Sequence, residues 1–161
     1  MSHWESPGAS DEWYTPRFVF DALGEVFDTD VAAPSRCHVP ARLSFSTNGL
    51  TNPWLGFVWM NPPFGGRNGL VPWLDRFFDH GNGIALVPDR TSAPWFQDAW
   101  ARADRALFTR KIRFLRPDGS EGVSPSNGTA LLASGRRGAR ALGRAAENGL
   151  GILAMPVAVA A

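Results

Sequence analysis

The sequence predicts an α/β protein with a mostly parallel sheet, helices on both faces and an antiparallel hairpin near the carboxyl terminus. Short apolar runs alternate with amphipathic stretches of about ten residues, which is typical of strands joined by crossover helices. The chain has 161 residues, of which 44% are hydrophobic and 19% are charged. This length and composition are typical of one globular domain that buries a sizeable core.

A single domain is expected over residues 11–161, preceded by a flexible tail over residues 1–10, because no internal repeat or long linker divides the sequence. The first helix is predicted to begin at Thr15-Pro16, since threonine can cap free amides and proline suits the first helical position. Its apolar face is expected to end near Asp28 and to consist of Phe18, Ala22, Leu23, Val26 and Phe27.

The remaining elements follow from apolar runs and their periodicity. Residues 34–55 are predicted to be mostly loop, because they are rich in Pro, Ser, Thr and Asn. The predicted strands are 28–33, which passes into the loop, then 56–60, 84–87, 106–108 and 152–157. The predicted helices are 71–80, 93–103 and 138–148. Residues 112–115 and 129–133 are expected to form the antiparallel hairpin around a long turn.

Composition excludes several classes of protein. The single cysteine, Cys37, excludes an internal disulfide framework and a cysteine-built zinc site, and it favours a reducing, cytosolic compartment. The three histidines are not spaced with acidic residues as metal ligands are, so no metal site is expected. No apolar run approaches the ~20 residues of a membrane span, and no signal peptide is visible, so no membrane association is expected.

The formal net charge of +1 conceals an uneven distribution. Residues 1–100 hold 6 basic and 11 acidic side chains, whereas residues 101–161 hold 10 basic and 4 acidic side chains. Such asymmetry is typical of a nucleic-acid-binding face. Fifteen of the 16 basic residues are arginine, which a GC-rich coding sequence explains, but it does not explain why the arginines fall late in the chain.

Asn61-Pro62-Pro63-Phe64 follows an apolar strand directly, which is where ligands bind in α/β sheets. The Asn61 side-chain oxygen and the Pro62 carbonyl can accept both hydrogens of an exocyclic amine, and the prolines fix that carbonyl in space. Phe64 can stack on a base that has left the duplex. A rigid turn without function is the alternative.

The ordered motifs of the chain resemble the small phage-type Dam family of DNA N6-adenine methyltransferases. The resemblance covers about residues 11–134, and its most specific element is the Asn61-Pro62-Pro63-Phe64 tetrapeptide. The other matching segments are Asp11-Glu12-Trp13-Tyr14-Thr15-Pro16, Phe27-Asp28-Thr29-Asp30-Val31-Ala32-Ala33, Asn48-Gly49-Leu50 with Trp54, and Leu86-Val87-Pro88-Asp89-Arg90-Thr91 with Trp95-Phe96. The resemblance implies a Rossmann-like methyltransferase sheet and transfer of a methyl group from S-adenosylmethionine to adenine in DNA.

The same resemblance implies a cofactor site around Asp30. Thr15 and Pro16 would lie against the methionine end of S-adenosylmethionine, and Asp30 would lie near its ammonium group or its ribose. Tyr14 either lines this cleft or packs against the first helix. Two positions depart from the wider pattern: Ala32-Ala33 stands where many methyltransferases have a Gly-x-Gly loop, and Asn48 stands where the family tends to have aspartate.

Contacts with DNA phosphates are expected from the late arginines and from Arg90, which follows the strand next to the motif. Arg113 is predicted to face solvent from the hairpin. Arg136, Arg140 and Arg144 form one helical stripe, for which a solvated helix face is the alternative to phosphate binding. The chain is too short for a separate target-recognition domain, so we expect short or relaxed sequence specificity, or recognition by a homodimer.

The resemblance also implies a cytoplasmic enzyme of a bacterial host cell, encoded by a phage or prophage, with a role such as protection against restriction. Two other readings remain open. A catalytically weakened protein on the same fold would bind nucleic acid without methylating it. An amino-methyltransferase acting on RNA or on a protein glutamine would use the same Asn-Pro-Pro-aromatic turn.

Overall fold

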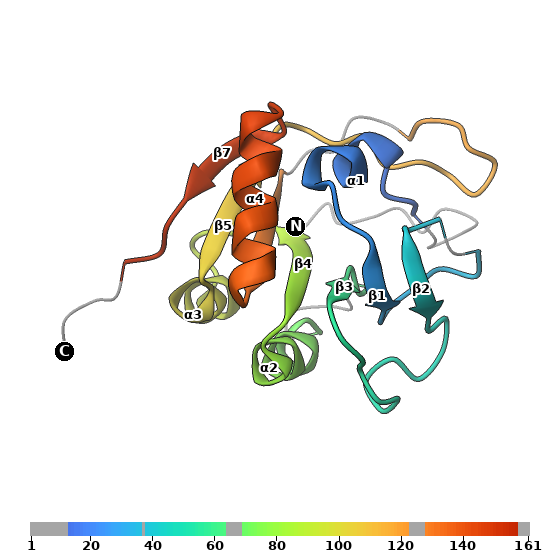
Figure 1. The fold of residues 1–161 in the computed structure, drawn as a ribbon, viewed down its shortest axis with the longest axis horizontal. Coiled ribbons are helices and arrows are strands. Elements are labelled where there is room, and N and C mark those ends of the chain that lie inside the picture. Colours follow the sequence, from blue (N-terminus) through green and yellow to red (C-terminus); the bar gives the residue numbers. More distant parts are fainter. Residues whose placement is uncertain (1–12, 37, 64–68, 123–127, 158–161) are drawn as a thin grey trace, which may run out of the picture.

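The computed structural model describes residues 13–36, 38–63, 69–122 and 128–157. In these residues one sheet contains seven strands in the order β2-β1-β3-β4-β6-β5-β7 (Figure 1). The strands are β1 (Phe27–Asp30), β2 (Ala41–Ser44), β3 (Val58–Met60), β4 (Gly83–Pro88), β5 (Arg105–Thr109), β6 (Thr129–Ser134) and β7 (Gly151–Ala154). The helices are α1 (Arg17–Leu23), α2 (Val71–His80), α3 (Pro94–Arg102) and α4 (Arg136–Glu147). The predicted tail over residues 1–10 lies outside the described residues.

The sheet is only half parallel. Strand β1 pairs in parallel with β2 and β3, and β3 pairs in parallel with β4. Strand β6 lies between β4 and β5 and runs antiparallel to both, and β7 runs antiparallel to β5. The α/β class is therefore confirmed, whereas the expectation of a mostly parallel sheet is wrong for the half that the late strands build.

Helices cover both faces of the sheet, as predicted. On one face, α1 and α4 pack side by side, and their buried residues Val19, Phe20, Leu23 and Leu142 join a cluster around Trp59 (Figure 1). On the other face, α2 and α3 contribute residues to a second cluster, which contains Leu74, Phe77, Phe96 and Ala99. Strand β4 is buried along its whole length because both clusters cover it.

The antiparallel hairpin exists, but its first strand is not the predicted one. Strand β6 pairs with β5, in the register Ala106 to Leu132. Residues 112–115 form no strand; Leu115 makes only isolated bridges to Tyr14 and Glu121. The sequence predicts a strand here because apolar and basic residues alternate, as in a half-buried strand. The structure keeps that alternation, since Ile112 is 2% exposed and Arg113 faces solvent, but the segment does not join the sheet.

The amino-terminal elements differ from the prediction at three points. Helix α1 ends at Leu23 because Gly24 adopts a left-handed conformation with φ of 64°, so Phe27 opens β1 instead of closing the helix. Pro16 is the residue at the helix cap, and no side chain caps the helix, so Thr15 does not serve that purpose. Strand β2 forms within the predicted loop; all but the first of its four residues are exposed, which hides it from a search for apolar runs.

The elements of the carboxyl-terminal part are displaced only slightly. Helix α4 begins at Arg136, two residues before the predicted start, and β7 ends at Ala154, three residues before the predicted end. Pro156 has no amide hydrogen to donate, which explains why the ladder does not continue.

Two arginines of α4 hold the turn between α1 and β1. Arg137 and Arg144 both bind the Glu25 carboxylate, at 2.8 Å and 2.9 Å, and the Glu25 side chain is 14% exposed. Arg137 and Arg144 also donate to the carbonyls of Val26 and Leu23. Part of the predicted basic stripe therefore has a structural role.

Candidate functional site

The order of the strands in the sheet reverses between β1 and β3. From β1 it continues to β2 on one side, and it then returns to build β3 and β4 on the other side. Ligands of α/β sheets bind beyond the carboxyl ends of the strands at such a switch point. We call the edge of the sheet at which β1–β4 end the carboxyl edge, and the opposite edge the amino edge.

Asp30 and Asn61 lie side by side at this switch point. Asp30 is the last residue of β1 and is paired in register with Trp59, and Asn61 follows the last residue of β3 directly. The Val31 amide continues the pairing by donating to the Trp59 carbonyl at 3.1 Å. The two polar residues that the sequence singles out on different strands are thus brought to one place.

Asn61 is held by a residue from the start of the chain. Its side-chain nitrogen donates a long hydrogen bond, 3.4 Å, to the hydroxyl of Thr15, which is 1% exposed. With its nitrogen engaged in this way, the Asn61 carboxamide presents its oxygen as an acceptor. Asn61 itself is half-buried.

The two prolines after Asn61 stiffen the backbone there. Pro62 is buried and Pro63 is exposed, and both peptide bonds are trans. The ring of Pro63 also restricts the backbone of Pro62, which limits the directions available to the Pro62 carbonyl. Phe64, the predicted stacking residue, lies outside the described residues.

Asp30 is a buried acid with a strongly altered affinity for protons. It is 1% exposed, and its carboxylate accepts a hydrogen bond from the Ala32 amide at 3.2 Å. Burial raises the pKa of Asp30 from 3.8 to about 7, and the bond from Ala32 opposes that rise. A cationic or hydroxyl-bearing ligand would compensate the lost hydration of the charged form, so this position fits the ammonium group or ribose of S-adenosylmethionine.

The loop that contains Asn48 packs against the end of β1. A Cβ atom on Gly49 would lie 2.0 Å from the carbonyl oxygen of Val31 and 2.7 Å from Trp73, so only glycine allows this approach. Asn48 has a left-handed conformation with φ of 55°, is exposed, and accepts hydrogen bonds from the Thr51 and Asn52 amides through its carbonyl. The loop therefore places Asn48 next to the β1 terminus.

Arg76 of α2 fastens this loop, a role that sequence reasoning missed. Its guanidinium donates to the carbonyls of Leu50 and Asn52 and lies 4.8 Å from the ring centre of Trp54. The Trp54 indole donates to the Gly49 carbonyl at 2.7 Å. The only signal in the sequence is one arginine on an amphipathic helix, which does not reveal partners about 25 residues away.

The other residues of the predicted cofactor site have structural contacts. Tyr14 is 7% exposed and exchanges backbone hydrogen bonds of 2.9 Å and 2.8 Å with Leu115. Its ring meets His38 edge-on, with 4.7 Å between the ring centres. Pro16 is buried, and Ala32 contributes its amide to Asp30.

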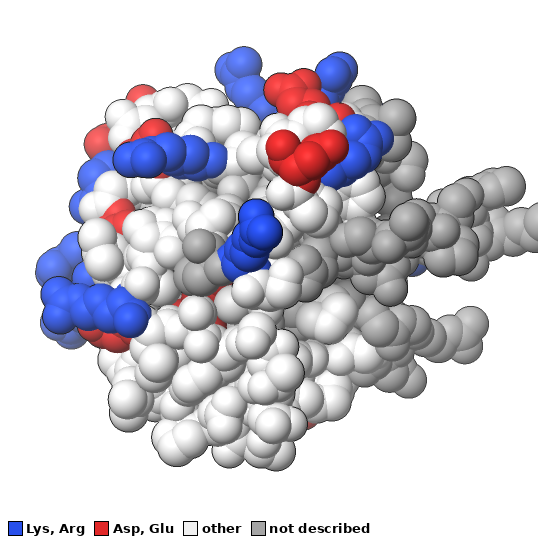
Figure 2. Space-filling view, turned by 90° about the vertical axis from the view of Figure 1, so that its right-hand side faces the viewer, with Lys and Arg blue, Asp and Glu red and all other residues white. Residues whose placement is uncertain are grey.

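The predicted phosphate-binding arginines lie at different edges. Arg90 follows β4 at the carboxyl edge and is exposed, and Arg113 is exposed and lies 3.6 Å from Glu121. Arg136 begins α4 at the amino edge, where the preceding Gly135 abuts the Gly81 carbonyl, and Arg140 lies one turn further along. Figure 2 shows separate groups of basic side chains, with acidic ones among them, along the margin of the face it draws, and one basic side chain near its centre.

The geometry defines an α/β protein with an Asn-Pro-Pro turn and a buried carboxylate at the switch point of its sheet. A family model described as DNA N-6-adenine-methyltransferase (Dam) matches residues 5–138, and the chain belongs to this family. The match includes every element from α1 to β6 and ends near the start of α4. No curated protein and no solved structure gave a significant match.

Two further findings concern the described residues alone. Within them, no three histidine, cysteine or acidic side chains gather as they do around a metal ion. None of the described helices has both the length and the apolar character needed to cross a membrane.

Proposed function

We propose that this protein transfers a methyl group from S-adenosylmethionine to the N6 amine of an adenine that has left the DNA duplex. The observation that carries the proposal is the juxtaposition of Asn61, held by Thr15, with buried Asp30 at the switch point. Membership in a family of DNA N6-adenine methyltransferases supports the choice of acceptor.

The asparagine turn would orient the amine. The Asn61 side-chain oxygen and the Pro62 carbonyl accept the two amine hydrogens, which directs the nitrogen lone pair towards the methyl donor. Phe64 stacks on the extruded base and offsets part of the cost of unstacking it. The main contribution of the protein is positioning, so no covalent enzyme intermediate is required.

Bound S-adenosylmethionine supplies an electrophilic methyl carbon on a sulfonium. The Asn61 oxygen and the Pro62 carbonyl would hold the amine nitrogen towards that carbon, and the proton that the amine gives up on methylation would pass to solvent. Asp30 would hold the ammonium group or the ribose, and Thr15, Pro16 and Tyr14 would form the wall beside it, with Asn48 close to the β1 terminus.

The test is mass spectrometry of DNA after incubation with the protein and S-adenosylmethionine. We expect N6-methyladenine with the wild type and a loss of roughly 10²–10³-fold in rate for Asn61→Ala, with cofactor affinity nearly unchanged. Asn82→Ala is the matched control, because Asn82 is also half-buried but lies at the amino edge. Absence of N6-methyladenine on every sequence tried, with folded protein, would disprove the proposal.

Two further measurements separate the other two readings. A pure nucleic-acid-binding protein would show no heat of S-adenosylmethionine binding in calorimetry. An RNA or protein amino-methyltransferase would methylate RNA, or a glutamine of a ribosomal or release-factor protein, in preference to DNA. The neutral Asn48 in place of an acid is the observation that motivates the first of these readings.

A further inference from the structure

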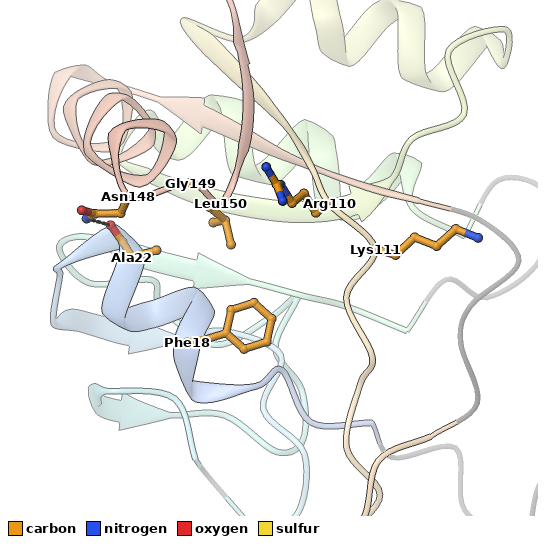
Figure 3. A pocket seen from close by; sticks show the side chains of 7 residues that line it. All are labelled: Phe18, Ala22, Arg110, Lys111, Asn148, Gly149 and Leu150. Carbon is orange, nitrogen blue, oxygen red and sulfur yellow. Dashed lines mark hydrogen bonds between the residues drawn. The ribbon is translucent and has the colours of Figure 1, made fainter.

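An open pocket lies between α1 and the segment that follows β5, outside the switch-point site. It has a volume of about 180 Å³, and α1 lines it with Phe18 and Ala22, the segment after β5 with Arg110 and Lys111, and the turn before β7 with Asn148, Gly149 and Leu150 (Figure 3). Small-molecule sites usually measure about 300–1,000 Å³, so this pocket suits one group of a larger ligand.

The pocket combines an aromatic ring with two cations. Phe18 is 53% exposed, and Figure 3 shows its ring directed into the space below Leu150 and Arg110, while the Lys111 side chain extends outward from the rim. Neither Arg110 nor Lys111 forms a salt bridge with an acidic side chain of the described residues. By contrast, Arg113 lies close to Glu121, and Arg137 and Arg144 bind Glu25.

The walls of the pocket connect directly to the Asn61 site. The segment from Arg110 leads to Leu115, whose paired backbone hydrogen bonds hold Tyr14, and Tyr14 precedes Thr15, the partner of Asn61. Phe18 lies on the first turn of α1, three residues after Thr15. Strand β5 runs in the same direction as β4, because β6 is antiparallel to both, so Arg110 after β5 lies at the carboxyl edge like Asn61 after β3.

We propose that this pocket binds the DNA strand beside the extruded adenine. Arg110 and Lys111 contact consecutive phosphates, and Phe18 packs against a base or sugar next to the vacated position. Exposed aromatic rings interleaved with cations are the usual features of strand-binding grooves. The inference rests on the proposed function, because the pocket can lie beside the extruded adenine only if that adenine binds at Asn61.

The test compares two pairs of basic residues. Arg110→Ala/Lys111→Ala removes the cations of the pocket, and Arg136→Ala/Arg140→Ala removes a pair on α4 that likewise forms no salt bridge within the described part of the chain. Binding of a labelled adenine-containing DNA duplex is measured by fluorescence anisotropy over a range of salt concentrations. Thermal unfolding monitored by circular dichroism verifies that each variant is folded.

We expect the pocket pair to weaken DNA binding about 10–100-fold at low salt and to reduce the slope of log affinity against log salt by about 2, since each lost phosphate contact contributes about 0.9. Phe18→Ala should weaken binding with little change in slope, because the ring carries no charge. The α4 pair begins at the amino edge, away from the amine site, so it should leave the slope unchanged, and that result would also show that the phosphate contacts predicted from the sequence for Arg136 and Arg140 do not form. Equal effects of both pairs, or a larger effect of the α4 pair, would overturn the inference.

The results that would disprove the proposed function differ from those that would disprove the pocket inference. If the wild type binds DNA through the pocket but forms no N6-methyladenine and binds no S-adenosylmethionine, the proposed function is wrong and the pocket remains a DNA site. If the wild type methylates DNA and the pocket variants bind it normally, only the pocket inference is wrong. Loss of affinity for an RNA of equal length, with DNA binding unchanged, would also overturn it.

Discussion

The contact between Thr15 and Asn61 joins residues 46 positions apart and directs the carboxamide nitrogen towards the Thr15 hydroxyl. An amide that rotates would present its nitrogen to the substrate amine and repel it, because both groups are donors. The Thr15 hydroxyl therefore acts as a positioning group for the proposed chemistry, in place of the capping role that the sequence suggests.

This role of Thr15 predicts a specific loss. Thr15→Val keeps the shape and removes the acceptor for Asn61, so we expect kcat for DNA methylation to fall about tenfold, which corresponds to the energy of about one hydrogen bond. Steady-state kinetics provide the measurement. Thr15→Ser should restore kcat with KM unchanged; equal losses in both variants would show that only packing matters.

Asp30 predicts a dependence of cofactor binding on pH. Because its pKa in the folded protein is about 7, the carboxyl group is partly protonated near neutrality, and a cationic ligand must displace that proton. S-adenosylmethionine affinity should rise as the pH increases through about 7 and then level off. Calorimetry in two buffers of different ionisation enthalpy measures the proton release, and Asp30→Asn should abolish both effects.

The same pKa predicts that Asp30 lowers the stability of the ligand-free protein at neutral pH. Between pH 3.8 and about 7 the unfolded chain releases a proton that the folded protein retains, so the free energy of unfolding should fall as the pH rises through this window. Asp30→Asn should flatten this dependence in urea unfolding. A variant with an unchanged pH profile would show that Asp30 is not the group responsible.

At the scale of elements, the carboxylate of Glu25 links α1 and α4 through two arginines. Glu25→Ala would leave Arg137 and Arg144 without this partner, so the free energy of unfolding should fall by about 1–2 kcal/mol in urea titrations. Part of the loss should disappear at high salt, because both guanidinium groups are partly exposed. Glu147→Ala, on the exposed end of α4, should change stability by less than about 0.5 kcal/mol.

The elements also show where sequence reasoning succeeds and where it fails. Strands β3 and β4 can be recognised in the sequence because both faces of each strand are buried, so their residues form apolar runs. Strand β2 is mostly exposed and leaves no such run. The pairing of β5 with β6 joins segments far apart in the sequence, so it cannot be read from either segment alone. Asn61 could be predicted because it follows the apolar strand β3, whereas Asp30 could be predicted only from the family resemblance, because β1 is not an apolar run. The Arg76 contacts could not, because they depend on how α2 packs against a loop.

At the scale of the whole molecule, part of the charge asymmetry is an exchange between the two parts of the chain. Arg102 lies 2.7 Å from Asp75, and Arg137 and Arg144 bind Glu25, so these late arginines neutralise early acids. Cations without such a partner among the described residues belong to particular places, such as Arg110 and Lys111. The net charge of the late part of the chain therefore overstates how many basic side chains are available to bind nucleic acid.

The fold of the described residues predicts limited reading of DNA sequence by this part of the protein. The described residues of the sheet and its helices form one unit without an inserted domain, so few side chains are available to contact base edges. Mapping N6-methyladenine on DNA of random sequence should give a short or relaxed consensus. A long, strictly required site for a monomeric protein would contradict this expectation, whereas a longer palindromic site would indicate a homodimer.

The two outer strands of the sheet, β2 and β7, bear on how the protein avoids aggregation. An uncovered strand offers a row of amides and carbonyls to which another chain can add. Both outer strands have only four residues; β2 carries exposed Arg42, and β7, whose Ile152 is 73% exposed, is followed closely by Pro156. A second chain that pairs with β7 can therefore form only a few backbone hydrogen bonds with it, which disfavours the growth of an intermolecular sheet from this edge.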